Sequence, residues 1–329
     1  SDLDGQSTPH ASVDGTAGTA TAIFAGPRSN CAIRSDSGAL ACWGGSYSYG
    51  EATPPAAVDG TAGTASALAA GNGLSCAIQS ETAAVVCWGR NTSGQATPPS
   101  AVDGTDGGAR AVAAGSGHAC AIQADSSNVV CWGNDSNGKT TPPDPVNGIA
   151  GTASAIAVGS EHSCAIQAET KAVVCWGYDG TPGPVVPAEV NGAAGTAEAI
   201  AAGWFHTCAI QSGSEAVVCW HSGPATIPPA EVNGTAGTAS AIAAGQFHSC
   251  ALQSETNAVV CWGSDLAGAA TPPDAVNGTA GTASAIATGR GHSGYSCAIQ
   301  SGSGGVVCWG GEVWYRETPP PSAVDGSTG

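Results

Sequence analysis

Short apolar stretches and polar turns alternate along the chain with a period of about 44 residues, and the pattern occurs seven times. In the second copy, residues 76–88, the stretches Cys-Ala-Ile-Gln and Ala-Val-Val-Cys-Trp flank the polar turn Ser-Glu-Thr-Ala. Two short, β-branched, apolar stretches around a polar turn predict an antiparallel β-hairpin. Centring the hairpin on this turn places Cys76 directly opposite Cys87 and Ile78 opposite Val85.

The two cysteines of each copy lie eleven positions apart, and together the copies use all fourteen cysteines of the chain. Directly opposed Cα atoms of an antiparallel pair are about 4.5–5.5 Å apart, a separation that a disulfide can bridge. Zinc binding is the competing interpretation, but the cysteines of a pair are too far apart for a Cys-x-x-Cys knuckle. We therefore predict seven disulfides within hairpins: Cys31–Cys42, Cys76–Cys87, Cys120–Cys131, Cys164–Cys175, Cys208–Cys219, Cys250–Cys261 and Cys297–Cys308.

Both faces of the predicted hairpin are apolar. One face carries the disulfide and Ile78, and the other carries Ala77 and Trp88. A sheet with two apolar faces must be covered on both sides. Seven small sheets, each packed between its neighbours, predict an all-β, seven-bladed β-propeller with one disulfide per blade, and we assign residues 1–329 to this single domain.

Each repeat divides into strand A (Ala-Ile-Ala-Ala), strand B (Cys-Ala-Ile-Gln), strand C (Val-Val-Cys-Trp) and segment D (Thr-Pro-Pro-x-x-Val). The prolines remove ladder donors, so D is an edge strand or merely extended. Segment D occurs eight times, although a seven-bladed ring has room for seven. Residues 1–14 and 317–329 are thus competing copies of the closing segment. The spare copy is either a frayed tail or a strand that joins molecules into an extracellular filament.

The composition indicates an exported protein. Paired cysteines require an oxidising compartment, so we expect a secreted, extracellular or cell-surface location. The chain has no methionine and no signal peptide, which we interpret as a mature, processed product. No apolar run is long enough to cross a bilayer. The formal net charge of −17 excludes nucleic acid and anionic membranes as partners.

The repeat Gly-x-x-His-Ser-Cys-Ala-Ile followed by Val-Val-Cys-Trp-Gly resembles the repeat of the regulator-of-chromosome-condensation family, whose members form seven-bladed propellers. The Thr-x-Pro-x-x-Val-x-Gly linker is similar to that of the secreted bacterial propellers that inhibit β-lactamases. The resemblance covers nearly the whole chain and implies the fold. The family hosts exchange factors, inhibitors and other exported proteins, so the resemblance does not select one function.

Aromatic residues outside the repeated tryptophans concentrate in two classes of loop. The A–B and C–D loops share one end of each blade, and we call that end the loop face. Rigidly held aromatics are typical of binding surfaces, and in the inhibitor relatives these loop classes carry the contact surface. Filling space over the channel mouth is the alternative role. The predicted partner-binding residues are Trp204, Phe205, Phe247 and Tyr295 in A–B loops and Tyr47, Tyr49, Tyr178, Trp314 and Tyr315 in C–D loops.

The sequence contains no catalytic motif, so we expect a non-enzymatic protein without a cofactor. Five A–B loops carry a histidine near the first cysteine: His118, His162, His206, His248 and His292. Because a whole blade separates adjacent histidines, we expect packing and hydrogen bonds to loop backbone rather than a metal site. Another protein or a second copy of the chain is the expected partner, with carbohydrate as the alternative. Asn-x-Ser/Thr sequons mark four candidate glycosylation sites: Asn91, Asn134, Asn233 and Asn277.

Overall fold

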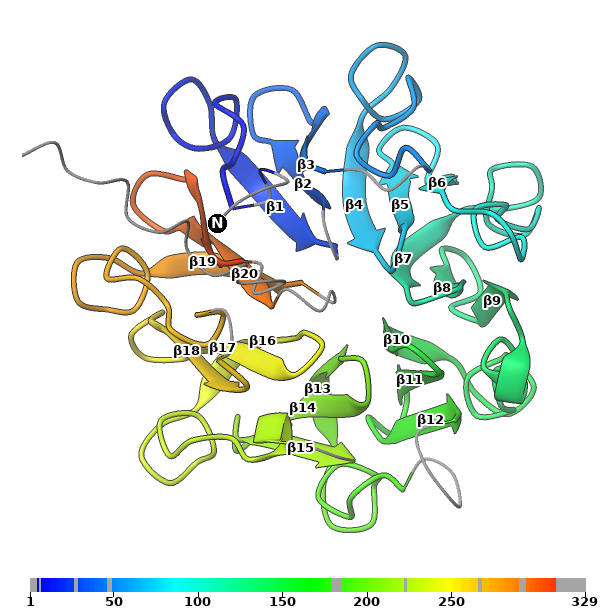
Figure 1. Cartoon of the computed structure of the whole chain (residues 1–329). Helices are drawn as coiled ribbons and strands as arrows, with labels where there is room; N and C mark the ends of the chain where they lie inside the picture. The colour runs from blue at the N-terminus through cyan, green and yellow to red at the C-terminus, as the bar shows by residue number, and fades with distance from the viewer. Residues whose placement is uncertain are drawn as a thin grey trace, which may run out of the picture.

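A computed structural model of the 329-residue chain describes residues 5, 7–26, 29–45, 49–178, 185–221, 224–265, 268–289 and 294–311. Within these residues the strands form seven antiparallel sheets of three strands each, arranged in a closed ring (Figure 1). The all-β propeller expected from the repeats is confirmed. The only helices in the described ranges are two short 3₁₀ turns, η1 (Ser136–Gly138) and η2 (Pro224–Thr226).

Each blade contains strands A, B and C in chain order. Blade 1 has β1 (Ala20–Ala25), β2 (Ser29–Arg34) and β3 (Leu40–Gly44); blade 2 has β4 (Ala65–Ala70), β5 (Leu74–Gln79) and β6 (Val85–Gly89); blade 3 has β7 (Ala109–Ala114), β8 (His118–Gln123) and β9 (Val129–Gly133). Blade 4 has β10 (Ala153–Val158), β11 (His162–Gln167) and β12 (Val173–Gly177); blade 5 has β13 (Ala197–Ala202), β14 (His206–Gln211) and β15 (Val217–His221). Blade 6 has β16 (Ala239–Ala244), β17 (His248–Gln253) and β18 (Val259–Gly263); blade 7 has β19 (Ala283–Thr288), β20 (Tyr295–Gln300) and β21 (Val306–Gly310).

The register between strands B and C is the one that the sequence predicts. In blade 2, Cys76 pairs with Cys87 and Ile78 with Val85. All seven predicted disulfides are present, with Cα atoms 4.0–4.1 Å apart, slightly closer than expected. Every cross-link therefore lies inside one hairpin, and the covalent bracing is local to each blade.

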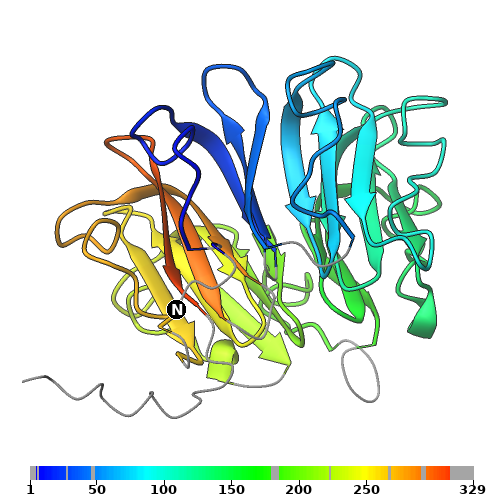
Figure 2. The ribbon, with the colours of Figure 1, turned by 45° about the horizontal axis from the view of Figure 1, so that its top comes forward.

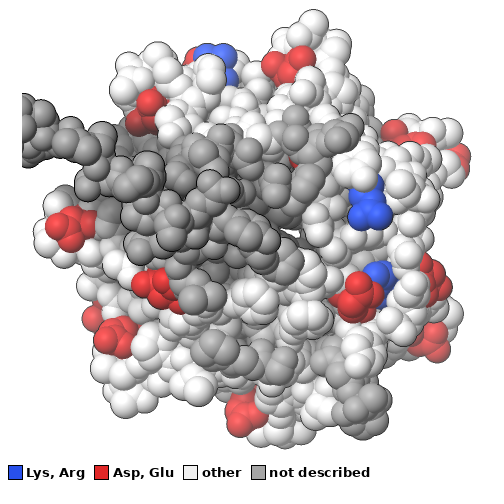
Figure 3. Space-filling view, viewed as in Figure 1, with Lys and Arg blue, Asp and Glu red and all other residues white. Residues whose placement is uncertain are grey.

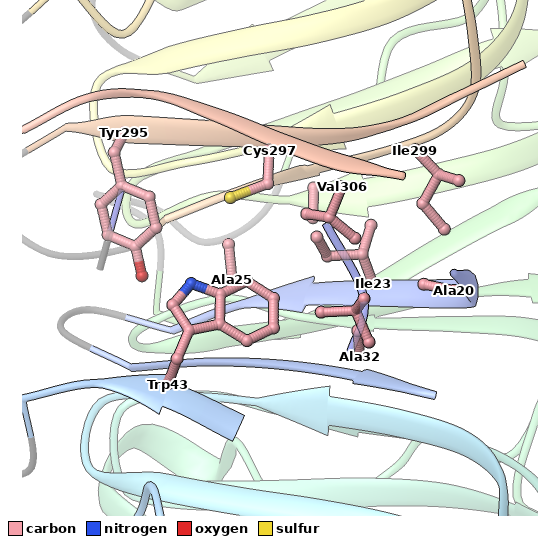
Figure 4. Close-up of a cluster of buried hydrophobic side chains, with 11 residues drawn as sticks. Ala20, Ile23, Ala25, Ala32, Trp43, Tyr295, Cys297, Ile299 and Val306 are labelled. Carbon is pink, nitrogen blue, oxygen red and sulfur yellow. The ribbon is translucent and has the colours of Figure 1, made fainter. Parts of the chain in front are cut away.

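Strand B is the most buried strand of a blade because neighbouring blades cover both of its faces. In blade 2, Cys76, Ala77 and Ile78 are all at most 3% exposed. The clusters of buried side chains lie between blades rather than within one. Figure 4 shows the cluster between blades 7 and 1, where Tyr295 and Trp43 lie on either side of Ala25. The core is thus a ring of inter-blade contacts.

Segment D is not the edge strand or extended segment that we expected, because it ends in a turn in which the carbonyl of Pro99 accepts the N–H of Val102 (3.0 Å). It pairs with strand C through one backbone bond. The carbonyl of Val102 accepts from the N–H of Val85 (2.8 Å), and Val102 has no exposed surface. Figure 2 shows the D–A links extending from one end of the ring, whereas η2, in a C–D loop, lies toward the other end. A large apolar side chain from every A strand lines the central channel, a cavity of about 220 Å³: Ile23, Leu68, Val112, Ile156, Ile200, Ile242 and Ile286.

Candidate functional site

The A–B and C–D loops are hydrogen-bonded to each other at one end of the blade. In blade 4 the backbone N–H of Tyr178, just after strand C, donates to the carbonyl of Glu161 in the A–B loop (2.8 Å). The same bond recurs in blades 3 and 6 through the N–H groups of Asn134 and Ser264, also at 2.8 Å. These bonds join the two loop classes into the loop face, which is turned toward the viewer in Figure 1.

Two phenylalanines project from adjacent A–B loops on this face. The side chains of Phe205 in blade 5 and Phe247 in blade 6 are 41% and 42% exposed. Phe205 lies beside Trp204, with ring centroids 6.0 Å apart and ring planes inclined by 46°. Trp204 is half-buried, and its backbone bonds to Gly245 (3.2 Å) and Ser160 (3.4 Å) hold it between blades 4 and 6. The scaffold therefore fixes this aromatic group in place.

Two tyrosines are exposed in the C–D loops. Tyr49 after blade 1 is 49% exposed, and Tyr178 after blade 4 is 44% exposed. Tyr178 follows strand C directly and is fixed by its bond to the A–B loop. The other predicted C–D aromatics, Tyr47, Trp314 and Tyr315, lie outside the described residues.

The placement of Tyr295 differs from the prediction. We expected it in an exposed loop, but it is the first residue of β20 and has no exposed surface. Its hydroxyl bonds to the Asn30 side chain (2.9 Å) and to the backbone of blade 1, including the carbonyl of Gly26. Tyr295 therefore joins blade 7 to blade 1 and does not form part of the exposed surface. The fifth predicted histidine, His292, lies outside the described residues.

Four buried histidines occupy the position in the other blades that Tyr295 occupies in blade 7. Each is the first residue of strand B and is at most 1% exposed. We had expected hydrogen bonds to loop backbone, but the Nε2 atoms bond to side-chain hydroxyls of the next blade. The pairs are His118–Ser163 (2.9 Å), His162–Thr207 (2.8 Å), His206–Ser249 (2.9 Å) and His248–Ser296 (2.9 Å).

The protonation of His248 follows from the second bond of its hydroxyl partner. The hydroxyl of Ser296 donates to the carbonyl of Ala269 (3.1 Å), so it accepts the proton carried on Nε2 of His248. Burial lowers the pKa of His248 to about 4, and the Asp265 carboxylate opposes this shift only partly. The imidazole is therefore neutral at pH 7.

The residue before each A–B loop must be glycine, since a Cβ at Gly203 would lie 2.4 Å from the His206 ring.

Blade 2 replaces the polar pair by an apolar one. Leu74 stands at the histidine position and is 1% exposed, and Ala119 stands at the hydroxyl position in blade 3 and is completely buried. Both belong to one hydrophobic cluster. The two partners thus change together, although 45 positions separate them in the sequence. The sequence does carry a signal for this contact. The residue two positions before the first cysteine of one repeat changes together with the residue one position before the first cysteine of the next repeat.

His221 breaks the repeat at the end of strand C. Its φ is +86°, in the left-handed region where the other six repeats have glycine. Its ring packs edge-on against His162 of blade 4, with centroids 5.6 Å apart, and against Trp220. Such a substitution needs surrounding contacts that favour it. Here the contacts add a second imidazole to the blade 4–5 interface beneath the loop of Phe205.

Charged groups contribute little to the described part of the loop face. In the view of Figure 3 the red and blue side chains lie mainly around the outer part of the ring, with uncharged surface between them. An ion pair joins Lys139 and Glu161 (2.7 Å), and the Lys139 side chain is only 4% exposed. The Lys139 carbonyl accepts the indole N–H of Trp176 (3.0 Å). This lysine therefore anchors the C–D loop rather than providing a free positive charge.

Three of the four sequon asparagines use their amide nitrogen inside a turn. At Asn233 and Asn277 it donates to the carbonyl of a proline five residues earlier (3.1 and 3.2 Å). At Asn91 it donates to Oγ1 of Thr97 (3.0 Å). At Asn134 the side-chain oxygen accepts a backbone N–H (2.8 Å). The Asn233 and Asn277 slots are turn positions, as their equivalence to Asp59 indicates.

Two further kinds of functional feature, a metal cluster and a membrane-spanning helix, are absent from the described residues. Within the described ranges, no three or more His, Cys, Asp or Glu side chains are arranged to hold a metal ion. In the same ranges, no helix is long and apolar enough to span a bilayer. The arrangement suits a rigid platform that presents aromatic side chains.

One repeat matches a family model at the sequence level. Residues 109–139, which comprise blade 3 and the start of its C–D loop, match the regulator of chromosome condensation (RCC1) repeat. The chain is a seven-bladed propeller in which blade 3 carries an RCC1-type repeat. No curated protein sequence matches it.

Solved structures with this fold include plant receptor ectodomains. The ectodomain of the Physcomitrella patens receptor kinase CR4 is 24% identical, with a TM-score of 0.67 over 89% of this chain and 74% of that chain. The CRINKLY WD40 ectodomain of the Arabidopsis thaliana receptor kinase ACR4 is also 24% identical, with a TM-score of 0.64 over 89% of this chain and 96% of that chain. Prp20p from Saccharomyces cerevisiae, described with its binding to Gsp1p and histones, is 16% identical, with a TM-score of 0.58 over 88% of this chain and 82% of that chain.

Proposed function

We propose that this RCC1-type propeller is an exported, non-enzymatic binding protein that captures another protein through its loop face. The observation that carries the proposal is the pair of exposed phenylalanines, Phe205 and Phe247, on adjacent blades. Folding of the scaffold already restricts both side chains. Burying them against a partner therefore gains apolar area with little further loss of side-chain entropy.

The disulfides and the neighbours support the location. All fourteen cysteines are paired, which favours an oxidising compartment. Two proteins of similar fold are receptor ectodomains, and a third, Prp20p, is described with protein partners. The low charge of the described loop face favours a protein partner recognised by shape and apolar contact over nucleic acid.

Site-specific photo-crosslinking tests the proposal. A photoreactive phenylalanine analogue replaces Phe205 or, in a second protein, Phe247, and each is irradiated with the extracellular fraction of the producing cells. Ile149, which is 75% exposed in a D–A link away from the loop face, is the matched control position. We expect the same protein adduct from positions 205 and 247, and no such adduct from position 149.

The adduct at position 205 should fall at least roughly tenfold when Phe247→Ala is added, since central interface aromatics carry most of the binding energy. Equal labelling from all three positions would remove the loop face from consideration. Saturable glycan binding that Phe205→Ala abolishes, without a protein adduct, would assign the face to carbohydrate instead.

A further inference from the structure

Blades 1 to 6 are all closed in the same way: strand C of each blade is hydrogen-bonded to the D segment that follows it in the chain. The first residue of strand C donates its backbone N–H to the carbonyl of a valine, and that valine has no exposed surface. The pairs are Leu40–Val58 (3.1 Å), Val85–Val102 (2.8 Å), Val129–Val146, Val173–Val190, Val217–Val232 and Val259–Val276 (2.9 Å each).

Blade 7 is closed by the other end of the chain. The N–H of Val306 in β21 donates to the carbonyl of Val13 (2.9 Å), and Val13 is completely buried. The hydroxyl of Ser7 reaches the carbonyl of Gly310 (2.9 Å). Residues 7–15 therefore fill a site on β21, which we call the blade 7 socket.

A second segment of the chain has the sequence and the spacing to fill the same socket. Val324 follows Val306 by 18 positions, just as Val58 follows Leu40 by 18 positions in blade 1. Residues 318–326 (Thr-Pro-Pro-Pro-Ser-Ala-Val-Asp-Gly) repeat the D pattern and lie outside the described residues. The connection that closes blade 1 is thus available to blade 7 as well.

The C-terminal copy also fits the pattern better than the N-terminal copy does. Three residues before its valine, each interior D segment has a proline whose carbonyl accepts the N–H of that valine, as Pro55 does from Val58 (3.0 Å). Pro321 occupies that position in the C-terminal copy. The N-terminal copy has His10, whose carbonyl accepts the same bond from Val13 (2.9 Å), so the two copies differ at this position only in the proline ring. A proline restricts the free segment, so less conformational entropy is lost on docking.

From these observations we infer that the blade 7 socket is a peptide-binding site for residues 318–326 of the same chain, which exchange there with residues 7–15. The 329-residue sequence contains two closing segments and one socket. If a segment of one molecule filled the socket of another, one segment per molecule would still be left over. Joining molecules therefore gains no additional contact, and we assign the socket to the molecule's own segment. This inference is independent of the loop face and of its proposed partner.

Point substitutions in the full chain test the exchange. A buried aspartate at the valine position prevents docking, because an unpaired charge is strongly disfavoured there. We expect Val13→Asp and Val324→Asp each to leave the Tm nearly unchanged, since the other copy closes the blade. The double variant should lower the Tm by at least roughly 5 °C. Val102→Asp, in the D segment that closes blade 2 and has no second copy, is the matched control and should show the full loss alone.

Two results would overturn the inference. One is a loss for Val13→Asp alone as large as that of the double variant, because residues 318–326 then cannot replace the N-terminal copy. The other is a double variant as stable as the parent. Sedimentation velocity of Val13→Asp separates the sources of the occupant: a monomer is expected, and oligomers that grow with concentration would place a second copy in the socket and refute the same-chain assignment.

Discussion

The hydrogen-bonded pair between blades 6 and 7 allows a sharp test of how the ring is held together. Removing the hydroxyl by Ser296→Ala leaves the Nε2 proton of the buried His248 without its acceptor, which costs about 1–3 kcal/mol. His248→Leu removes the imidazole instead. The double variant copies the natural Leu74–Ala119 pair of blades 2 and 3. We expect it to be more stable than the sum of the single effects by about 1–3 kcal/mol.

The same pair predicts a pH dependence with a definite sign. The folded pKa of His248, about 4, lies below the value of 6.5 for a free imidazole. The native state therefore binds fewer protons than the unfolded state between these values. The stability is complete above about pH 6.5 and falls as the pH drops toward 4, by about 2 kcal/mol at pH 5. His248→Leu should remove this part of the acid sensitivity.

Urea unfolding of the oxidised protein at pH 7 and pH 5 measures both quantities, with the midpoint and slope compared among the four proteins. The other buried histidines are the same in all four proteins, so the difference between parent and variant isolates His248. Strictly additive single effects would refute the hydrogen-bond argument. An identical loss of stability at pH 5 in the parent and in His248→Leu would refute the assigned pKa.

Two further substitutions test the backbone and the cross-links. Gly133→Ala should lower the stability by about 1–3 kcal/mol, because its φ is +103° and the new Cβ would lie 2.6 Å from the carbonyl oxygen of Gly117. Gly94→Ala is the control: its φ is also positive, but no atom lies within 4 Å of the new Cβ, so its loss should be smaller. Urea unfolding compares the two variants. Replacing Cys120 and Cys131 together by alanine should cost about 2–3 kcal/mol in the same assay, and an unchanged midpoint would show that this disulfide does not stabilise the blade.

The regular part of the fold could be predicted because its determinants are local. The apolar pattern of strands B and C and the spacing of the two cysteines fix the register of Cys76 with Cys87, and burial on both faces follows from Ala77 and Ile78. Segment D was correctly expected to be poor in ladder bonds because of its prolines. These inferences need only residues that are neighbours within one repeat.

The candidate site was less predictable because it depends on loops and on contacts between repeats. Repeat 7 has three inserted residues, and we aligned its histidine by residue type, whereas counting back from Cys297 places Tyr295 at the buried position. The partners of the histidines lie one repeat further on, so no local pattern reveals them. The exposure of Phe205 and Phe247 follows from loop geometry, which the repeat itself does not encode.

The confinement of every disulfide to one hairpin has a consequence for how the chain folds and oxidises. Each cysteine's native partner is only eleven residues away, so the correct thiols meet as soon as one turn has formed. Oxidation can then proceed blade by blade while later repeats are still unfolded, before the ring has closed. Maturation of this protein should therefore depend weakly on a disulfide isomerase, because near neighbours are the first thiols that each cysteine encounters.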